Sequence, residues 1–134
     1  MTANHPTAIR RFFRDETGQS NVASLLITPI ALLLVLAVPQ AGAYYQASTV
    51  AQAAANAAYS ASRLMEGSAA EGRQAAQQVL AQHEGSLRGA EVSISASGDR
   101  MTVTVSGTAP TFTGEWLSPP VTRSITGPVE KVVR

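Results

Sequence analysis

Apolar residues dominate one long stretch near the start of the chain, and no charge interrupts it. Between Thr17 and Ser62 there is no Asp, Glu, Lys or Arg. Taken from Val22 to Ala43, the stretch has 22 residues and extends about 33 Å as an α-helix, against a bilayer core of about 30 Å. The pattern therefore predicts a membrane-spanning helix. Its large apolar side chains and internal proline are Val22, Leu25, Leu26, Ile27, Pro29, Ile30, Leu32, Leu33, Leu34, Val35, Leu36 and Val38.

A buried helix in the core of a soluble domain is the alternative explanation of this stretch. The rest of the chain is too small to surround a helix of that length, so we favour the membrane. Pro29 and Pro39 oppose a regular helix in water, but membrane helices tolerate proline better.

The sequence changes after the apolar stretch without a helix-breaking residue. Residues 43–64 read AYYQASTVAQAAANAAYSASRL, and alanine is the best helix former. We therefore expect one helix from about Val22 to Leu64. Its small residues form one slim face, which suits close approach of another helix, although helix propensity alone explains the alanine content equally well. The slim face comprises Ala51, Ala54, Ala55, Ala58 and Ser62.

A second, shorter helix is predicted after Gly67. Ser68 and Glu71 have the spacing of a capping box, with Ser68 as the N-cap. The helix should end at about residues 83–84, with Gly85 at the C′ position. One side is lined by Ala75, Ala76, Val79, Leu80 and His83.

The C-terminal part alternates apolar and polar residues with a period of two, which is typical of strands. Glu91–Ser97 and Met101–Ser106 flank Gly98-Asp99, which suits a type II′ hairpin turn. A register with Ser97 opposite Arg100 places every apolar side chain on one face, and a slip of one residue would destroy this match. The pairs that follow are Ala96 with Met101, Ile94 with Val103 and Val92 with Val105.

A third strand is expected at Val121–Thr126, after a link too rich in Gly and Pro for regular structure. We expect Phe112, Trp116 and Leu117 in that link to fold back onto the sheet. The apolar face of the hairpin needs a cover, and either helix can supply it. The predicted fold class is α+β: a long N-terminal transmembrane helix, a second short helix and a small antiparallel sheet.

The composition limits the kinds of catalytic site, metal site and partner that the chain can have. The 134 residues suffice for one domain, only 14% are charged, and the net charge of +1 gives no indication of a nucleic-acid partner. There is no Cys, which excludes disulfides, thiol catalysis and cysteine metal sites. His5 and His83 have no neighbouring acidic cluster, and no nucleophile or phosphate-binding motif occurs. We expect no enzyme activity, no catalytic residue, no metal, no cofactor and no small-molecule substrate.

The flanking charges predict the topology. Arg10, Arg11 and Arg14 precede the apolar stretch, so the N-terminus should lie in the cytoplasm and the C-terminal part outside, in a single pass. A competing signal is Ala41-Gly42-Ala43, which has the A-x-A form of a signal peptidase site. Cleavage after Ala43 would require a leader of 43 residues, longer than the usual 15–30.

The order of these elements resembles the TadE-like minor pseudopilins of the tight-adherence (Tad/Flp) branch of type IV pili. The residues that carry the resemblance are Gly18, Thr28-Pro29, Gln40-Ala41-Gly42, Tyr44-Tyr45 and Asn56-Ala57-Ala58, with a looser match in MTVTVSGTAP and LSPPVTRSITGPVE. The resemblance implies cleavage by a membrane prepilin peptidase between Gly18 and Gln19. It divides the chain into a cytoplasmic leader (1–18), a transmembrane and extracytoplasmic helix (19–64) and a small exported domain (65–134). It also implies other pilin or pseudopilin helices, the peptidase and membrane lipid as partners.

One position departs from the family. The fifth residue after the cut is usually Glu, which is thought to pair with a neighbouring subunit's N-terminal amine. Here it is Ala23. Either the protein is not a repeating filament subunit, or Gly18 is not cut, or a partner protein supplies the carboxylate.

Two alternatives remain at the level of sequence. Signal peptidase could release a small exported binding domain beginning at Tyr44. The chain could also remain an uncleaved single-pass membrane protein with an unrelated outer domain.

Overall fold

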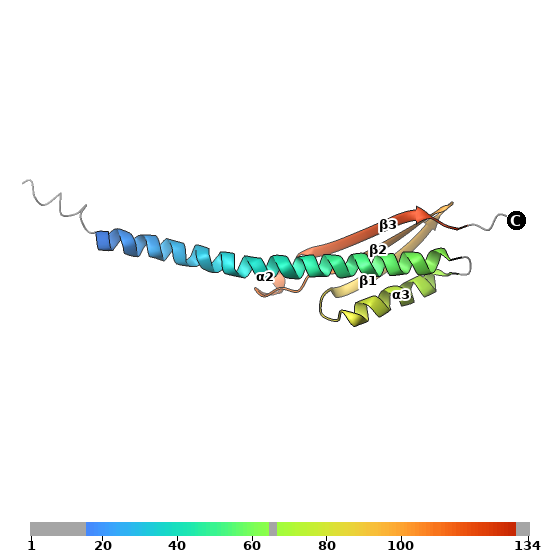
Figure 1. Cartoon of the computed structure of the whole chain (residues 1–134), viewed down its shortest axis with the longest axis horizontal. Helices are drawn as coiled ribbons and strands as arrows, with labels where there is room; N and C mark the ends of the chain where they lie inside the picture. The colour runs from blue at the N-terminus through green and yellow to red at the C-terminus, as the bar shows by residue number, and fades with distance from the viewer. Residues whose placement is uncertain (1–15, 65–66, 131–134) are drawn as a thin grey trace, which may run out of the picture. The chain divides into compact units, whose positions relative to one another are not determined.

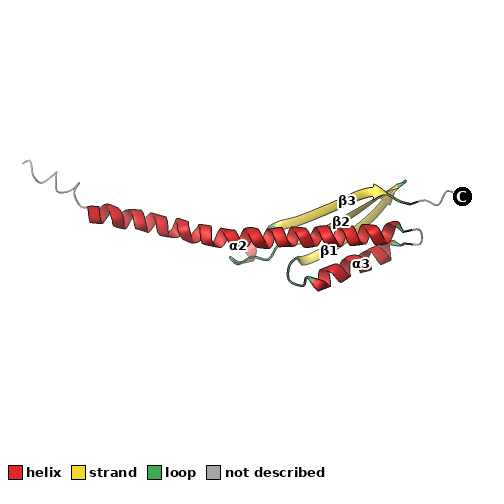
Figure 2. Cartoon of the chain, viewed as in Figure 1, coloured by secondary structure: helices red, strands yellow, loops and turns green. Residues whose placement is uncertain are grey.

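The computed structural model describes residues 16–64 and 67–130, and these residues have the predicted α+β fold. A long helix and a short helix precede strands that form an antiparallel sheet in the order β1-β2-β3 (Figure 2). The chain divides into two compact units, Met1–Ala37 and Val38–Arg134. The elements are α2 (Glu16–Arg63), α3 (Ala69–Gln82), β1 (Arg88–Ser97), β2 (Arg100–Thr108), the 3₁₀ turn η1 (Glu115–Leu117) and β3 (Pro120–Pro128).

Helix α2 has 48 residues and runs through both prolines without a break in its helical assignment. The predicted continuation of the apolar helix into the alanine-rich segment is therefore confirmed. A proline in a helix leaves the carbonyl four residues earlier without its usual donor. Next to Pro29, the Thr28 hydroxyl donates to the Ser24 carbonyl at 2.7 Å, which adds a hydrogen bond in that turn.

Helix α3 begins at the predicted capping box. The Ser68 hydroxyl accepts from the Glu71 amide at 3.2 Å, and the Ser68 amide donates to the Glu71 carboxylate at 3.0 Å. The predicted C-terminus is wrong by one position, because the C-cap is His83 and Gly85 therefore lies one residue beyond C′. Gly85 has a φ of +84° and sits in a turn closed by the Ser86 amide and the His83 carbonyl. Gly85 is the third residue of this turn, a position that favours positive φ.

The hairpin has the predicted register, from Ser97 opposite Arg100 to Val92 opposite Val105. Gly98 has a φ of +64°, and no described non-glycine residue has a positive φ. Asp99 therefore has a negative φ, as a type II′ turn requires. Strand β3 includes the predicted third strand and pairs with β2 along its whole length. On the polar face, threonine and serine hydroxyls of β2 and β3 form side-chain hydrogen bonds.

Strand β1 begins three residues earlier than predicted, and a bulge explains the difference. Arg88 pairs with Thr108 but Glu91 pairs with Ser106, so two residues of β1 oppose Gly107 alone. Gly89, the first of the two, has a φ of +58°, the conformation of a glycine bulge. A Cβ on Gly107 would lie 2.8 Å from the Arg88 carbonyl oxygen. Both glycines thus permit the close approach of the strands.

The core of the second unit is built on the slim face of α2. Val103, Val105 and Val121 of the sheet are fully buried and belong to one apolar cluster with the alanines of α2. Both helices cover the sheet, as Figure 1 shows. The slim face therefore packs within this chain. The buried alanines of α2 are Ala47, Ala51, Ala54, Ala55 and Ala58.

Two glycines mark where other elements approach α2 most closely. A Cβ on Gly72 of α3 would clash with the Ser62 hydroxyl and would lie 2.9 Å from the Ala58 carbonyl oxygen. A Cβ on Gly127 of β3 would clash with the Tyr59 ring. The Tyr59 hydroxyl donates to the Pro128 carbonyl at 3.0 Å, which fastens the C-terminal part of α2 to the end of β3.

The expectation that the β2–β3 link folds its large side chains back onto the sheet is wrong. Phe112, Trp116 and Leu117 are 66%, 80% and 48% exposed. The reason is that alanines of α2 already cover the apolar face of the sheet. The three side chains project from a separate loop, residues 109–119, hereafter the β2–β3 loop.

Candidate functional site

The apolar part of α2 presents its side chains to the surroundings. Every residue from 21 to 39 is exposed, and the large apolar side chains predicted to lie in a membrane are between 36% and 78% exposed. Among the described residues, this is one helix long and apolar enough to cross a membrane or to act as a signal sequence. Apolar exposure on this scale marks a surface that contacts lipid or protein.

The predicted processing positions lie at different points along α2. Gly18 and Gln19 are in its first turn, two and three residues after its start. Ala23 lies one turn further on and is exposed. Ala41 and Ala43 lie near the middle of the helix along its length. The arginines of the basic arm fall outside the described residues, and both cleavage sites stay predictions.

Gln40 joins α2 to the β2–β3 loop. Its side-chain amide donates to the Pro110 carbonyl at 3.3 Å, and its side-chain oxygen accepts from the Phe112 amide at 3.3 Å. Both the nitrogen and the oxygen of the Gln40 side-chain amide therefore form hydrogen bonds with the same loop. Gln40 lies only two residues beyond Val38, about 3 Å along the helix axis, so the loop is held beside the end of the apolar stretch.

The β2–β3 loop satisfies many of its own polar groups. The Thr111 hydroxyl donates to the Gly114 carbonyl at 2.7 Å, and the Trp116 indole N–H donates to the Thr113 carbonyl at 3.1 Å. The Ala109 amide donates to the Pro119 carbonyl at 3.0 Å, which closes the base of the loop. The loop thus presents a small hydrogen-bonded platform with its aromatic side chains outward.

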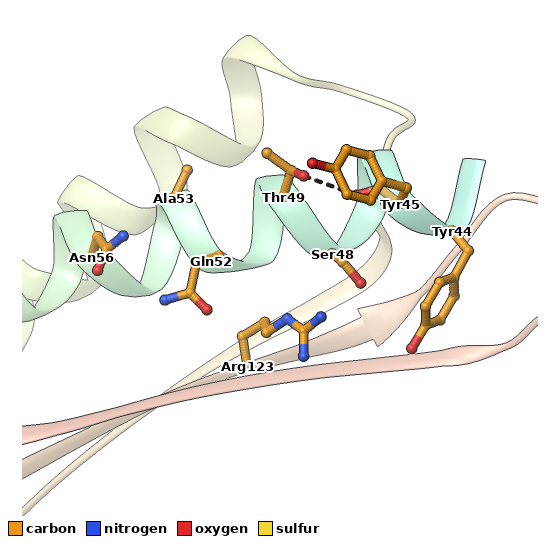
Figure 3. Close-up of a pocket in the computed structure, with 8 residues that line it drawn as sticks. All are labelled: Tyr44, Tyr45, Ser48, Thr49, Gln52, Ala53, Asn56 and Arg123. Atoms are coloured by element: carbon orange, nitrogen blue, oxygen red, sulfur yellow. Dashed lines mark hydrogen bonds between the residues drawn. The ribbon is translucent and has the colours of Figure 1, made fainter. Parts of the chain in front are cut away.

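An open groove of about 520 Å³ lies on α2 just beyond Gln40 (Figure 3). Its lining contains one charged residue, Arg123 of β3, and no acidic residue. Figure 3 shows the Arg123 guanidinium on the same side of α2 as the Ser48 side chain and the Tyr44 ring. The groove is lined by Tyr44, Tyr45, Ser48, Thr49, Gln52, Ala53, Asn56 and Arg123.

Ser48 is unusual among these residues. It is only 7% exposed, and its buried hydroxyl has no hydrogen-bond partner among the described residues. Thr49 beside it donates to the Tyr45 carbonyl at 3.0 Å, the usual solution for a hydroxyl in a helix. The Arg123 guanidinium and the side-chain amides of Gln52 and Asn56 line the groove and can together receive an anionic or polar group.

The histidine singled out in the sequence has a local role in the fold. The His83 ring nitrogen Nδ1 lies 3.0 Å from the Val79 carbonyl oxygen, one turn earlier in α3. Within residues 16–64 and 67–130, no group of three or more His, Cys, Asp or Glu side chains is placed to hold a metal ion. The absence of enzyme activity stays a prediction.

Three residues at the β2–β3 loop contact and the groove, Gln40, Ser48 and Arg123, were not predicted as site residues. Gln40 contributed only to the family resemblance, and neither Ser48 nor Arg123 stood out. A polar residue with two hydrogen-bonding ends, directly after an apolar stretch, was the available signal for Gln40. No local pattern pairs Arg123 with α2, because 75 residues separate it from Ser48.

No protein-family model, curated protein or solved structure matches the chain.

Proposed function

We propose that the protein is a minor pseudopilin or assembly component of a Tad-type pilus. Residues 22–43 anchor it in the cytoplasmic membrane, with the N-terminus inside and the small domain outside. Prepilin peptidase cuts it after Gly18, and the mature chain begins at Gln19. It acts by packing its apolar helix against other pilin or pseudopilin helices, without catalysis.

The course of α2 is the observation that carries this proposal. One helix, Glu16–Arg63, is apolar and exposed in its first half and buries an alanine face against a small antiparallel sheet in its second half. This is the architecture expected of a pilin-like protein. The exposed apolar part of this helix is a surface suited to contact with lipid or protein.

The helical setting of the two cleavage sites favours Gly18 over Ala43. The part of a helix that packs on a core opens rarely. Gly18 lies far along α2 from its packed part, whose first buried residue is Ala47. Ala43 lies next to residues that are held by Gln40 and by the core, so a peptidase would have to unwind a packed segment to reach it.

The N-terminus of the protein in its native cell tests the proposal. Mass spectrometry should find the chain beginning at Gln19 in the membrane or pilus fraction. The variant Gly18→Leu should retain its leader, because a bulky side chain replaces the small residue before the cut, and Ala43→Leu should be processed normally. A chain beginning at Tyr44 in the culture medium would instead establish an exported domain. An intact N-terminus in the membrane would indicate an uncleaved single-pass protein.

A further inference from the structure

The aromatic residues of the β2–β3 loop lie where a membrane surface would begin. If the apolar stretch crosses the bilayer, its outer boundary falls between Val38 and Ala43, because about 20 helical residues fill the hydrocarbon core. Gln40 lies inside that interval and binds the loop through both ends of its side chain. Figure 1 shows the loop against α2 near the start of the second unit. The headgroup region adds roughly 5–7 Å on each side of the core, so a loop held at Gln40 lies within it.

The chemistry of the loop matches that position. Trp116 is 80% exposed and Phe112 66% exposed, whereas most of the other large apolar side chains described outside the apolar stretch are buried or half-buried. Trp and Tyr concentrate at membrane–water interfaces. Tyr44 and Tyr45, both exposed, follow Gln40 by one turn of α2. Two separate segments of the chain thus place exposed aromatic side chains near the same part of α2.

The hydrogen bonds of the loop permit entry into a medium of low polarity. An unpaired N–H group is costly there. The Trp116 indole N–H is already bonded to the Thr113 carbonyl, and the Leu117 amide to the Gly114 carbonyl at 3.2 Å. Glu115 is the one charged residue of the loop, and its carboxylate restricts the loop to the headgroup region.

We propose that the β2–β3 loop is a second membrane contact, seated in the interfacial layer of the outer leaflet through Phe112, Trp116 and Leu117. The inference rests on the proposed membrane insertion of α2. The partner is a lipid surface, and the contact holds the exported domain at the bilayer instead of leaving it on a free stalk. Gln40 couples the two anchors, because it belongs to the helix and binds the loop.

Trp116 provides a direct test, because it is the only tryptophan in the chain. The full chain is reconstituted into phosphatidylcholine vesicles, and its emission is quenched either by acrylamide in water or by phosphatidylcholine brominated near the headgroup. The matched control is the double variant Trp116→Phe, Asp99→Trp. This variant moves the reporter to the β1–β2 turn, about 30 Å away along β2.

The expected result is a loss of most Trp116 emission in brominated vesicles with weak quenching by acrylamide, and the reverse for the control. Trp116 quenched only by acrylamide, in protein that resists alkaline extraction, overturns the second contact and leaves the helix anchor intact. Protection from both quenchers shows that a protein surface or a second copy covers the loop, which also overturns it. Protein that is extracted by alkali overturns the helix anchor and the loop contact together.

Discussion

Side-chain size decides the packing of this molecule at single positions. The core of the second unit is formed largely by alanine and valine, whose short side chains let backbones approach closely. At Gly72 even a methyl group has no room, because the Ser62 hydroxyl, the Ala58 carbonyl and the Ile94 side chain surround the position. At Gly42, by contrast, an added Cβ meets nothing within 4 Å.

Replacing these two glycines by alanine should therefore have opposite effects. Gly72→Ala should lower the free energy of unfolding by about 1–3 kcal/mol, the usual cost of overpacking. Gly42→Ala, the matched control, should be neutral or should stabilise the protein by up to about 1 kcal/mol, because alanine favours a helix interior. Urea unfolding of both variants in the same detergent measures the difference. Equal stability of the two would contradict the close crossing of α2 and α3.

At the scale of elements, those whose pattern lies within a short segment of the sequence could be predicted, and those that depend on distant residues could not. The hairpin register follows from the alternation of Val92, Ile94, Val103 and Val105, because one residue of slip moves every side chain to the other face. The capping box at Ser68 is likewise complete within four residues. The orientation of Trp116 was not predictable, because it depends on the distant alanines of α2 that already cover the sheet.

The bulge at Gly89 and the contact at Gln40 could not be predicted either, because both depend on residues that are distant in the sequence. Gly89 is one of ten glycines, and nothing in its neighbourhood marks it as the one opposite Gly107. Gln40 finds its partners 70 and 72 residues later. The apolar stretch could be recognised from its own composition, whereas the surface next to it, at Gln40 and the β2–β3 loop, depends on the fold.

Gln40 holds the β2–β3 loop on α2 through two hydrogen bonds. In the variant Gln40→Ala, the Phe112 amide loses its acceptor, and its hydrogen exchange should accelerate by about 5- to 10-fold, which corresponds to a net hydrogen bond of roughly 1 kcal/mol. Gln46→Ala, at an exposed position of the same helix, should leave the exchange unchanged. NMR in detergent micelles measures both. Unchanged exchange at Phe112 in Gln40→Ala would show that the base of the loop alone holds it.

At the scale of the whole molecule, the apolar and alanine-rich halves of α2 have different surroundings. The first half has no core to enter among the described residues, whereas the second half is buried against the sheet. The two halves should therefore respond differently to charge.

A lysine at the centre of the apolar stretch should prevent membrane insertion. Leu33→Lys adds a cost of about 2.5–3.5 kcal/mol for a charge at the middle of a membrane helix, together with the lost contribution of the leucine. Ser60→Lys, at an exposed position of the same helix, should have no effect on insertion. Alkaline extraction of cell membranes, followed by immunoblotting, measures the integral fraction. Full retention of Leu33→Lys would argue against a spanning helix.

The alanine face of α2 has a mechanical consequence. Alanine has no rotatable side chain, so packing it costs little conformational entropy, but a face of methyl groups also offers few ridges to resist sliding along the helix axis. The axial position of the sheet then depends on side chains near the two ends of the interface. Gln40 holds the β2–β3 loop, and Tyr59, about 28 Å further along the axis, holds the Pro128 carbonyl. A pulling force applied to the sheet along α2 would therefore act first on the hydrogen bonds at these two points.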